Sequence, residues 1–201
     1  MSEQALFPIR DAGGVDLRHP DAGRLGYDPA DTLRTAWLSD ESPEPLYRWT
    51  LHRRTGSGEV LTFIMLNPST ADALADDPTI TKCLGFAARL GFSGIQVVNL
   101  YPWRATKPAD LWSARRAGAD ITGGRKGNGI LEDALRDAAR DDRLMLAAWG
   151  ANAAKDPARV KWLCSLPGAG RLHALSITRD GHPGHPLMLP YSCIPIRWEP
   201  R

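Results

Sequence analysis

Apolar residues along the chain gather in short runs that polar residues, glycine and proline separate. The clearest run covers residues 60–67, V-L-T-F-I-M-L-N, and it stops at Asn67-Pro68. Proline has no backbone N–H to donate and biases the residue before it towards extended geometry, so a buried strand must end at Asn67. Because ligands of open α/β sheets bind beyond the carboxyl ends of the strands, Asn67 is the first candidate site residue.

Three more apolar runs predict buried strands further along the chain. They cover residues 95–100, 144–149 and 171–177. Segments with helical spacing separate the runs, so strands and helices alternate. Such alternation is typical of right-handed crossovers and of a mostly parallel sheet with helices on both faces. We therefore expect an α/β fold of three layers, α/β/α, around a central, mostly parallel four-stranded sheet.

Residues typical of helix ends support this order of elements. Asp77-Pro78 provides an N-cap and a first helical residue, and Gly91 is expected to end the helix. Asp156-Pro157 begins another helix in the same way. Two further helices are expected over 109–117 and 130–140, with the glycine-rich stretch 122–129 as a loop.

The first quarter of the chain predicts less regular structure. Residues 1–45 are rich in glycine, proline and aspartate and indicate a loop-rich lead-in with a short turn around 33–38. Residues 47–53 alternate bulky and polar side chains, and a turn separates them from the run 60–67. This pattern predicts an antiparallel hairpin with 47–53 as an edge strand. Residues 46–201 would then form a single α/β domain.

Composition excludes several classes of protein. The formal net charge of the 201-residue chain is +2, so it has no global basic signature for nucleic acid, and any DNA contact would need a local patch. Cys83, Cys164 and Cys193 are odd in number and far apart, which supports neither a disulfide framework nor a metal site. No apolar run approaches the length of a membrane span, and no signal peptide is recognisable. We expect a cytoplasmic monomer without metal, cofactor or membrane contact.

Polar residues follow the predicted strands where they end. Asn67 and Asn99 end two strands, Gly150 follows the third, and the loop H-P-G-H-P with His182 and His185 follows the fourth. An asparagine amide offers an acceptor and two donors, which suits the edge of a nucleobase, and a histidine can donate to a developing anion. Both residue types are also common in ordinary solvated loops. One of the acidic residues of the first loop is expected to reach the same edge: Asp72, Asp76 or Asp77.

Four short motifs at these strand ends resemble the uracil-DNA glycosylase superfamily. M-L-N-P-S resembles its first motif, V-V-N-L followed by W-R-A-T its second strand, L-A-A-W-G-A-N-A its third, and H-P-G-H-P-L its closing motif. More narrowly, the block from M-L-N-P-S to N-L-Y-P-W-R-A-T resembles an uncharacterised bacterial and phage domain family (domain of unknown function 1643). Met65 and Ser69 stand where the superfamily has glycines. This difference would narrow the approach of a substrate to the backbone, or adapt the loop to a different substrate.

The resemblance implies a role for each matching residue. Asn67 would position the attacking water or support the sugar and base of the substrate. Asn99 would read the Watson–Crick edge of a flipped base, and His185 would stabilise charge on the departing base. His182 remains an alternative to His185, because both precede a proline. The other implied residues are Phe86, Tyr101 and Trp103 as an aromatic wall of the base pocket, and Ser69, Thr70 and Arg104 as loop contacts to phosphate.

The expected function is therefore that of a DNA glycosylase-like hydrolase. It would excise a deaminated or modified base of the uracil type from single- or double-stranded DNA, with no metal. Two alternatives use the same pocket: an enzyme that processes a nucleotide or modified base, and a non-catalytic module that binds a nucleobase or DNA.

Overall fold

The structure of the protein is a computed structural model that describes residues 27–28, 32–40 and 45–200. Its strands are β1 Tyr27–Asp28, β2 Thr32–Leu38, β3 Arg48–Arg54, β4 Leu61–Met65, β5 Gly94–Asn99, β6 Met145–Ala147, β7 His173–Ala174 and β8 Ile196–Arg197. Its α-helices are α1 Pro78–Arg89, α2 Pro108–Arg116, α3 Gly124–Arg140 and α4 Pro157–Ser165. Short 3-10 helices are η1 Ala151–Lys155, η2 Ala169–Arg171 and η3 Pro186–Met188.

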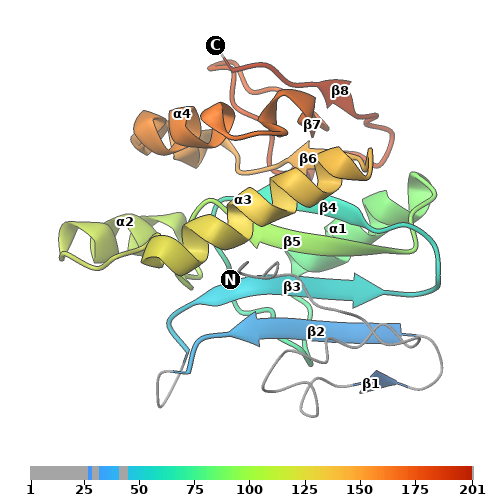
Figure 1. The fold of residues 1–201 in the computed structure, drawn as a ribbon, viewed down its shortest axis with the longest axis horizontal. Coiled ribbons are helices and arrows are strands. Elements are labelled where there is room, and N and C mark those ends of the chain that lie inside the picture. Colours follow the sequence, from blue (N-terminus) through green and yellow to red (C-terminus); the bar gives the residue numbers. More distant parts are fainter. Residues whose placement is uncertain (1–26, 29–31, 41–44, 201) are drawn as a thin grey trace, which may run out of the picture.

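All described strands belong to one sheet, in the order β1-β2-β3-β5-β4-β6-β7-β8 (Figure 1). The strands β5, β4, β6 and β7 run parallel to one another at its centre. The strands on either side, β1 to β3 and β8, pair in antiparallel fashion. The predicted α/β class is confirmed, but the sheet is mixed and wider than the sequence indicated.

The predicted hairpin and edge strand are wrong. β3 pairs antiparallel with β2 and β5, so it lies inside the sheet and does not contact β4 as a partner strand. The turn after β3 instead crosses the start of β5, where Thr55 N donates to Ser93 O (2.8 Å) and Ser93 N donates to Glu59 O (2.8 Å). The hairpin was predicted from the turn between two apolar runs, which is a feature of the local sequence alone. The partners of β4 depend on burial of both its faces, which favours parallel neighbours.

Hydrophobic side chains cover both faces of the sheet. Ile64 of β4 packs in one cluster with Leu131 of α3 and Leu163 of α4. Its neighbour Phe63 packs in a second cluster with Phe86 of α1. Successive residues of a strand point to opposite faces, so these two clusters lie on the two sides of the sheet. Figure 1 shows α3 in front of the sheet and α1 behind it.

Helix α1 begins and ends where the sequence predicts. Asp77 is its N-cap, and Oδ1 of this residue accepts a hydrogen bond from Ile80 N (2.9 Å). Pro78 occupies the first turn, where its missing N–H leaves no acceptor unsatisfied. Gly91, with φ +84°, adopts the left-handed conformation that ends the helix.

Helix α3 begins six residues before the predicted start at residue 130, inside the stretch 122–129 that was expected as a loop. Gly127 lies within its first turns, where a Cβ atom would lie 2.0 Å from Thr122 O. The glycine therefore permits close packing of the helix start on the preceding turn. Glycine is a poor helix former, and the glycines of this stretch are the reason why the sequence predicted a loop here.

The segment expected as a turn around 33–38 is instead strand β2. The remainder of the predicted lead-in lies outside the described residues, except for β1, residues 39–40 and residue 45. Within the described part of the chain, no helix is both long and apolar enough to cross a membrane.

Candidate functional site

A cavity of about 540 Å³ lies at the edge of the sheet where β4 and β6 end. Its walls come from six segments: the start of β3, the loop after β4, the start of α1, the loop before α2, the turn after β6 and the loop with His185. Four residues predicted for the site line this cavity: Asn67, Ser69, Thr70 and His185. Four other residues of the same loops and turns also line it: Asp77, Trp149, Gly150 and Leu187. The carboxyl ends of parallel strands thus form a ligand-sized hollow, as the strand-end rule predicts.

Asn67 brings one free hydrogen-bond acceptor to this cavity. Its Nδ2 donates to the backbone oxygens of Pro68 (2.9 Å) and Ala105 (2.8 Å). Because a carbonyl oxygen can only accept, these two bonds identify which side-chain atom is the nitrogen. Both amide hydrogens are used, and Oδ1 remains to bind a water molecule or an N–H group.

His185 brings a donor. Its Nδ1 accepts from Leu187 N (3.3 Å), so the neutral ring carries its hydrogen on Nε2. Burial lowers the pKa of His185, and the charge of Asp77 opposes that shift. By its accessible surface the residue is nevertheless exposed, so the desolvation of its ring is incomplete. At neutral pH the ring is an uncharged Nε2–H donor.

Glycines allow the turn after β6 to approach the His185 loop. Gly150 has φ +72° and donates its N–H to Pro183 O (3.0 Å). A Cβ atom at position 150 would lie 3.3 Å from the Cβ atom of His185. A Cβ atom at Gly184 would lie 1.9 Å from Ser176 Oγ. The turn at Gly150 therefore also positions the histidine.

Of the three acidic residues considered for this edge, Asp77 lines the cavity. Oδ1 of Asp72 accepts from the backbone of Leu74 (2.8 Å) and Ala75 (2.9 Å), which shapes the loop. Asp76 forms an ion pair with Arg53 (Nε–Oδ1 2.7 Å). The roles of these two carboxylates are therefore structural.

Arg48 lines the cavity and was not recognised from the sequence. Its Nη1 donates to Ala71 O (2.9 Å), and burial lowers its pKa to about 10, so the guanidinium stays charged at neutral pH. The residue occurs in a strand with alternating polar and apolar positions, where an arginine indicates a solvent-exposed face. Its burial depends on the neighbouring strands and on the loop above it, for which no local signal exists.

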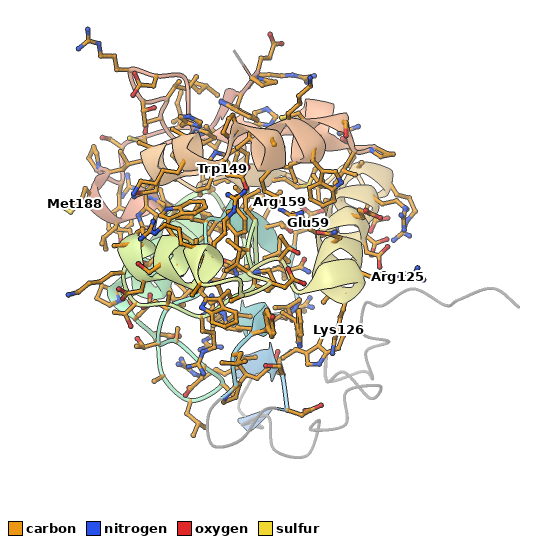
Figure 2. All side chains as sticks on the ribbon, turned by 90° about the vertical axis from the view of Figure 1, so that its left-hand side faces the viewer. Glu59, Arg125, Lys126, Trp149, Arg159 and Met188 are labelled. Carbon is orange, nitrogen blue, oxygen red and sulfur yellow. The ribbon has the colours of Figure 1, made fainter. Side chains whose placement is uncertain are left out.

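The residues expected to form an aromatic wall lie elsewhere. Phe86 belongs to the buried face of α1, where it meets Tyr191 edge to face. Tyr101 is buried on the opposite face, and its hydroxyl donates to Asp156 (2.8 Å). Trp103 packs edge to face against Tyr47. Among the described phenylalanine, tyrosine and tryptophan residues, the one that lines the cavity is Trp149. Figure 2 labels it near the centre of the molecule.

Asn99 ends β5 as predicted but does not line the cavity. It lies opposite Met65 in the register of β4 and β5, and Met65 does line the cavity. Asn99 is buried, and neither polar atom of its side chain has a hydrogen-bond partner among the described residues. To contact a base in this cavity, Asn99 would have to lie at the end of β4, but it lies on the neighbouring strand β5.

Two further predicted residues lie outside the cavity. His182 borders a separate hollow near Trp198, which identifies His185 as the histidine of this site. Arg104 donates from Nη1 to Pro45 O (3.1 Å) and supports the loop before α2.

Exposed apolar side chains flank the site. Leu187 is 38% exposed and lines the cavity, whereas Met188 is 88% exposed. Figure 2 shows Met188 at the periphery of the molecule, away from Trp149 and Arg159. Both apolar residues belong to η3, which directly follows His185.

The described residues contain no cluster of three or more histidine, cysteine and acidic side chains arranged to hold a metal ion. All three cysteines are free thiols. Burial raises the pKa of Cys83, which makes this thiol a poor nucleophile.

Comparison with known proteins identifies a family for most of the chain. No curated protein and no solved structure matches this chain. The family described as "Protein of unknown function (DUF1643)" matches residues 48–187, from Arg48 at the cavity to Leu187 at its rim. The chain belongs to this family.

Proposed function

We propose that the protein is a hydrolase of the DNA glycosylase type, which releases a uracil-like base from DNA. One observation carries this proposal: the cavity holds an acceptor, Asn67 Oδ1, and an uncharged donor, His185 Nε2–H, at the ends of parallel strands. Hydrolysis of an N-glycosidic bond needs a water molecule held near the sugar and hydrogen bonds to the departing base. The resemblance of the strand-end motifs to the uracil-DNA glycosylase superfamily supports the same assignment.

Asn67 would act on the attacking water, and His185 would act on the departing base. Asn67 Oδ1 would accept a hydrogen bond from the attacking water and orient it towards C1′ of the sugar. His185 would donate from Nε2 to an oxygen of the base as negative charge develops there. Neither step requires the side chain to gain or lose a proton.

Labelled oligonucleotides that contain uracil, hypoxanthine, xanthine or hydroxymethyluracil test the proposal. Each is incubated, single- and double-stranded, with the parent protein, and base loss is read as alkali-induced strand cleavage. We expect release of at least one base and a loss of about 100-fold or more in Asn67→Ala. Because the amide also holds the loop through Pro68 O and Ala105 O, thermal melting of the variant must accompany the assay. A parent protein inert towards every substrate would refute the proposal.

A nucleotide- or modified-base-processing enzyme is the second candidate. The position of the predicted aromatic wall outside the cavity favours it, because among the described phenylalanine, tyrosine and tryptophan residues a flipped base would meet Trp149 alone. Binding of free nucleotides by a parent protein that leaves DNA unchanged would support this candidate.

A further inference from the structure

Arg48 lines the cavity with a guanidinium that is only partly hydrogen-bonded. Its side chain is 2% exposed, and its Nη1 is bonded to Ala71 O. Its Nε has no partner among the described residues. A guanidinium carries five N–H donors, and a buried donor without a partner is costly. The described residues therefore leave this guanidinium incompletely satisfied.

Nearby carboxylates do not neutralise Arg48 directly. Asp76 is held by Arg53 (2.7 Å), and Oδ1 of Asp77 accepts from Ile80 N (2.9 Å). Asp77 and Asp72 attract the guanidinium charge only at longer range, while Arg104 and Arg53 oppose it. A desolvated, unpaired cation in a cavity wall favours a ligand atom that carries negative charge.

We propose that Arg48 stabilises the negative charge that develops on the departing base. This inference rests on the proposed glycosylase function. As the bond between C1′ and the base nitrogen breaks, its electron pair passes to the base and delocalises onto a carbonyl oxygen. The water oxygen forms the new bond to C1′, and the proton that it loses ends on the base. Arg48 donates to the carbonyl oxygen, so the substrate class is an oxo-base whose carbonyl is conjugated with the departing nitrogen.

The effect of an Arg48 substitution on the reaction rate should depend on the departing base if Arg48 stabilises its charge. The effect should be the same for every base if Arg48 only supports the fold. Fluorine at C5 stabilises the anion of uracil, so 5-fluorouracil needs less charge stabilisation from the protein. Single-turnover rates are measured on oligonucleotides with uracil or 5-fluorouracil for the parent, Arg48→Met and Arg48→Lys. We expect Arg48→Met to lose about 100-fold on uracil and less than about 10-fold on 5-fluorouracil. Arg48→Lys, which keeps the charge, should lose less on both and show a smaller difference between them.

Arg53→Met is the matched control. Arg53 bonds to the carbonyls of Asp72 and Ala75 in the same loop, but it does not line the cavity. Any rate loss in this variant should be equal for the two bases. An equal loss for both bases in Arg48→Met would overturn the inference and assign Arg48 a purely structural role. If Arg48→Met does not fold, the ratio of the two losses in Arg48→Lys, compared with Arg53→Met, decides in the same way.

Calorimetric binding of free 5-fluorouracil distinguishes failure of this inference from failure of the proposed function. The parent should bind the base more tightly above the pKa of 5-fluorouracil than below it, and Arg48→Lys should preserve that preference better than Arg48→Met. This preference in a protein that releases no base would refute the glycosylase and retain Arg48 as an anion-binding residue. Turnover without preference for the anion would overturn the inference alone.

Discussion

At the scale of single residues, His185 couples the site to pH. Its folded-state pKa lies below the ordinary value of about 6.5, because burial disfavours the charged ring. Between these two values the unfolded chain binds more protons than the folded protein. The stability that the neutral ring contributes is therefore present above pH 6.5 and is lost as the pH falls through the folded-state value.

We accordingly expect the free energy of unfolding of the parent to fall more steeply between pH 7 and pH 5 (from about half a unit above the ordinary pKa to about one and a half units below it) than that of His185→Gln. Glutamine retains a polar side chain at this position but does not titrate. Urea unfolding of both proteins at the two pH values measures the difference. Parallel pH profiles for the two proteins would contradict a lowered histidine pKa.

The predicted site residues divide according to the kind of signal that they carry. Asn67 and His185 were predicted because a strand end followed by a loop is visible in a local stretch of sequence, and both line the cavity. Phe86 and Tyr101 were predicted to line the base pocket because they carry aromatic rings. A large ring packs equally well in a hydrophobic core, and both residues lie in the core. Which face a side chain occupies depends on the pairing of strands that are distant in sequence.

At the scale of elements, Asp77 joins the start of α1 to the chemistry of the site. Its Oδ1 caps Ile80 N (2.9 Å), and its charge raises the pKa of His185 against the stronger effect of burial. Asparagine is an equally good N-cap but carries no charge. Asp77→Asn should therefore lower the pKa of His185 further while it preserves the helix.

Titration of the His185 ring protons by NMR measures this shift. Asp77→Ala is the comparison, because it removes the charge and the cap together. We expect it to lower the free energy of unfolding by about 1 kcal/mol relative to Asp77→Asn. An unchanged His185 pKa in Asp77→Asn would show that the two groups are not coupled.

Helices α1 and α3 explain which element boundaries the sequence reveals. The start of α1 combines an N-cap, a proline and an apolar face, so several local signals agree. The start of α3 contains Gly124 and Gly127, whose local preference opposes a helix. Close packing of Gly127 on Thr122 and Pro102 outweighs that preference, and such packing is a tertiary effect.

At the scale of the whole molecule, the outer strands of the sheet hold the loop that forms one wall of the cavity. Arg34 of β2 donates to Leu74 O (3.3 Å) and pairs with Asp76 (3.1 Å). Arg53 of β3 also pairs with Asp76, and it donates to the carbonyls of Asp72 and Ala75. The loop between β4 and α1 is therefore shaped by strands that precede it in sequence.

This arrangement gives β2 a role that the predicted lead-in of residues 1–45 did not include. β2 covers β3, and Thr35 O accepts from Nη1 of the buried Arg53 (3.3 Å). A chain that begins at residue 41 would leave the β3 edge open and Arg53 less completely paired. Such an edge favours aggregation, and breaking a buried charge network costs about 3 kcal/mol or more. We expect this shortened chain to melt well below the full chain or to aggregate.

Circular dichroism during heating, with light scattering, compares the two chains. Ala36→Asp in the full chain is the matched control, because it buries a charge between β2 and the core without removing any residue. Both changes should lower the melting temperature and reduce the proposed base release, since the loop that carries Thr70 and Asp77 loses its support. A shortened chain with the melting temperature of the full chain would show that β2 is dispensable and that the loop after β4 maintains its conformation without it.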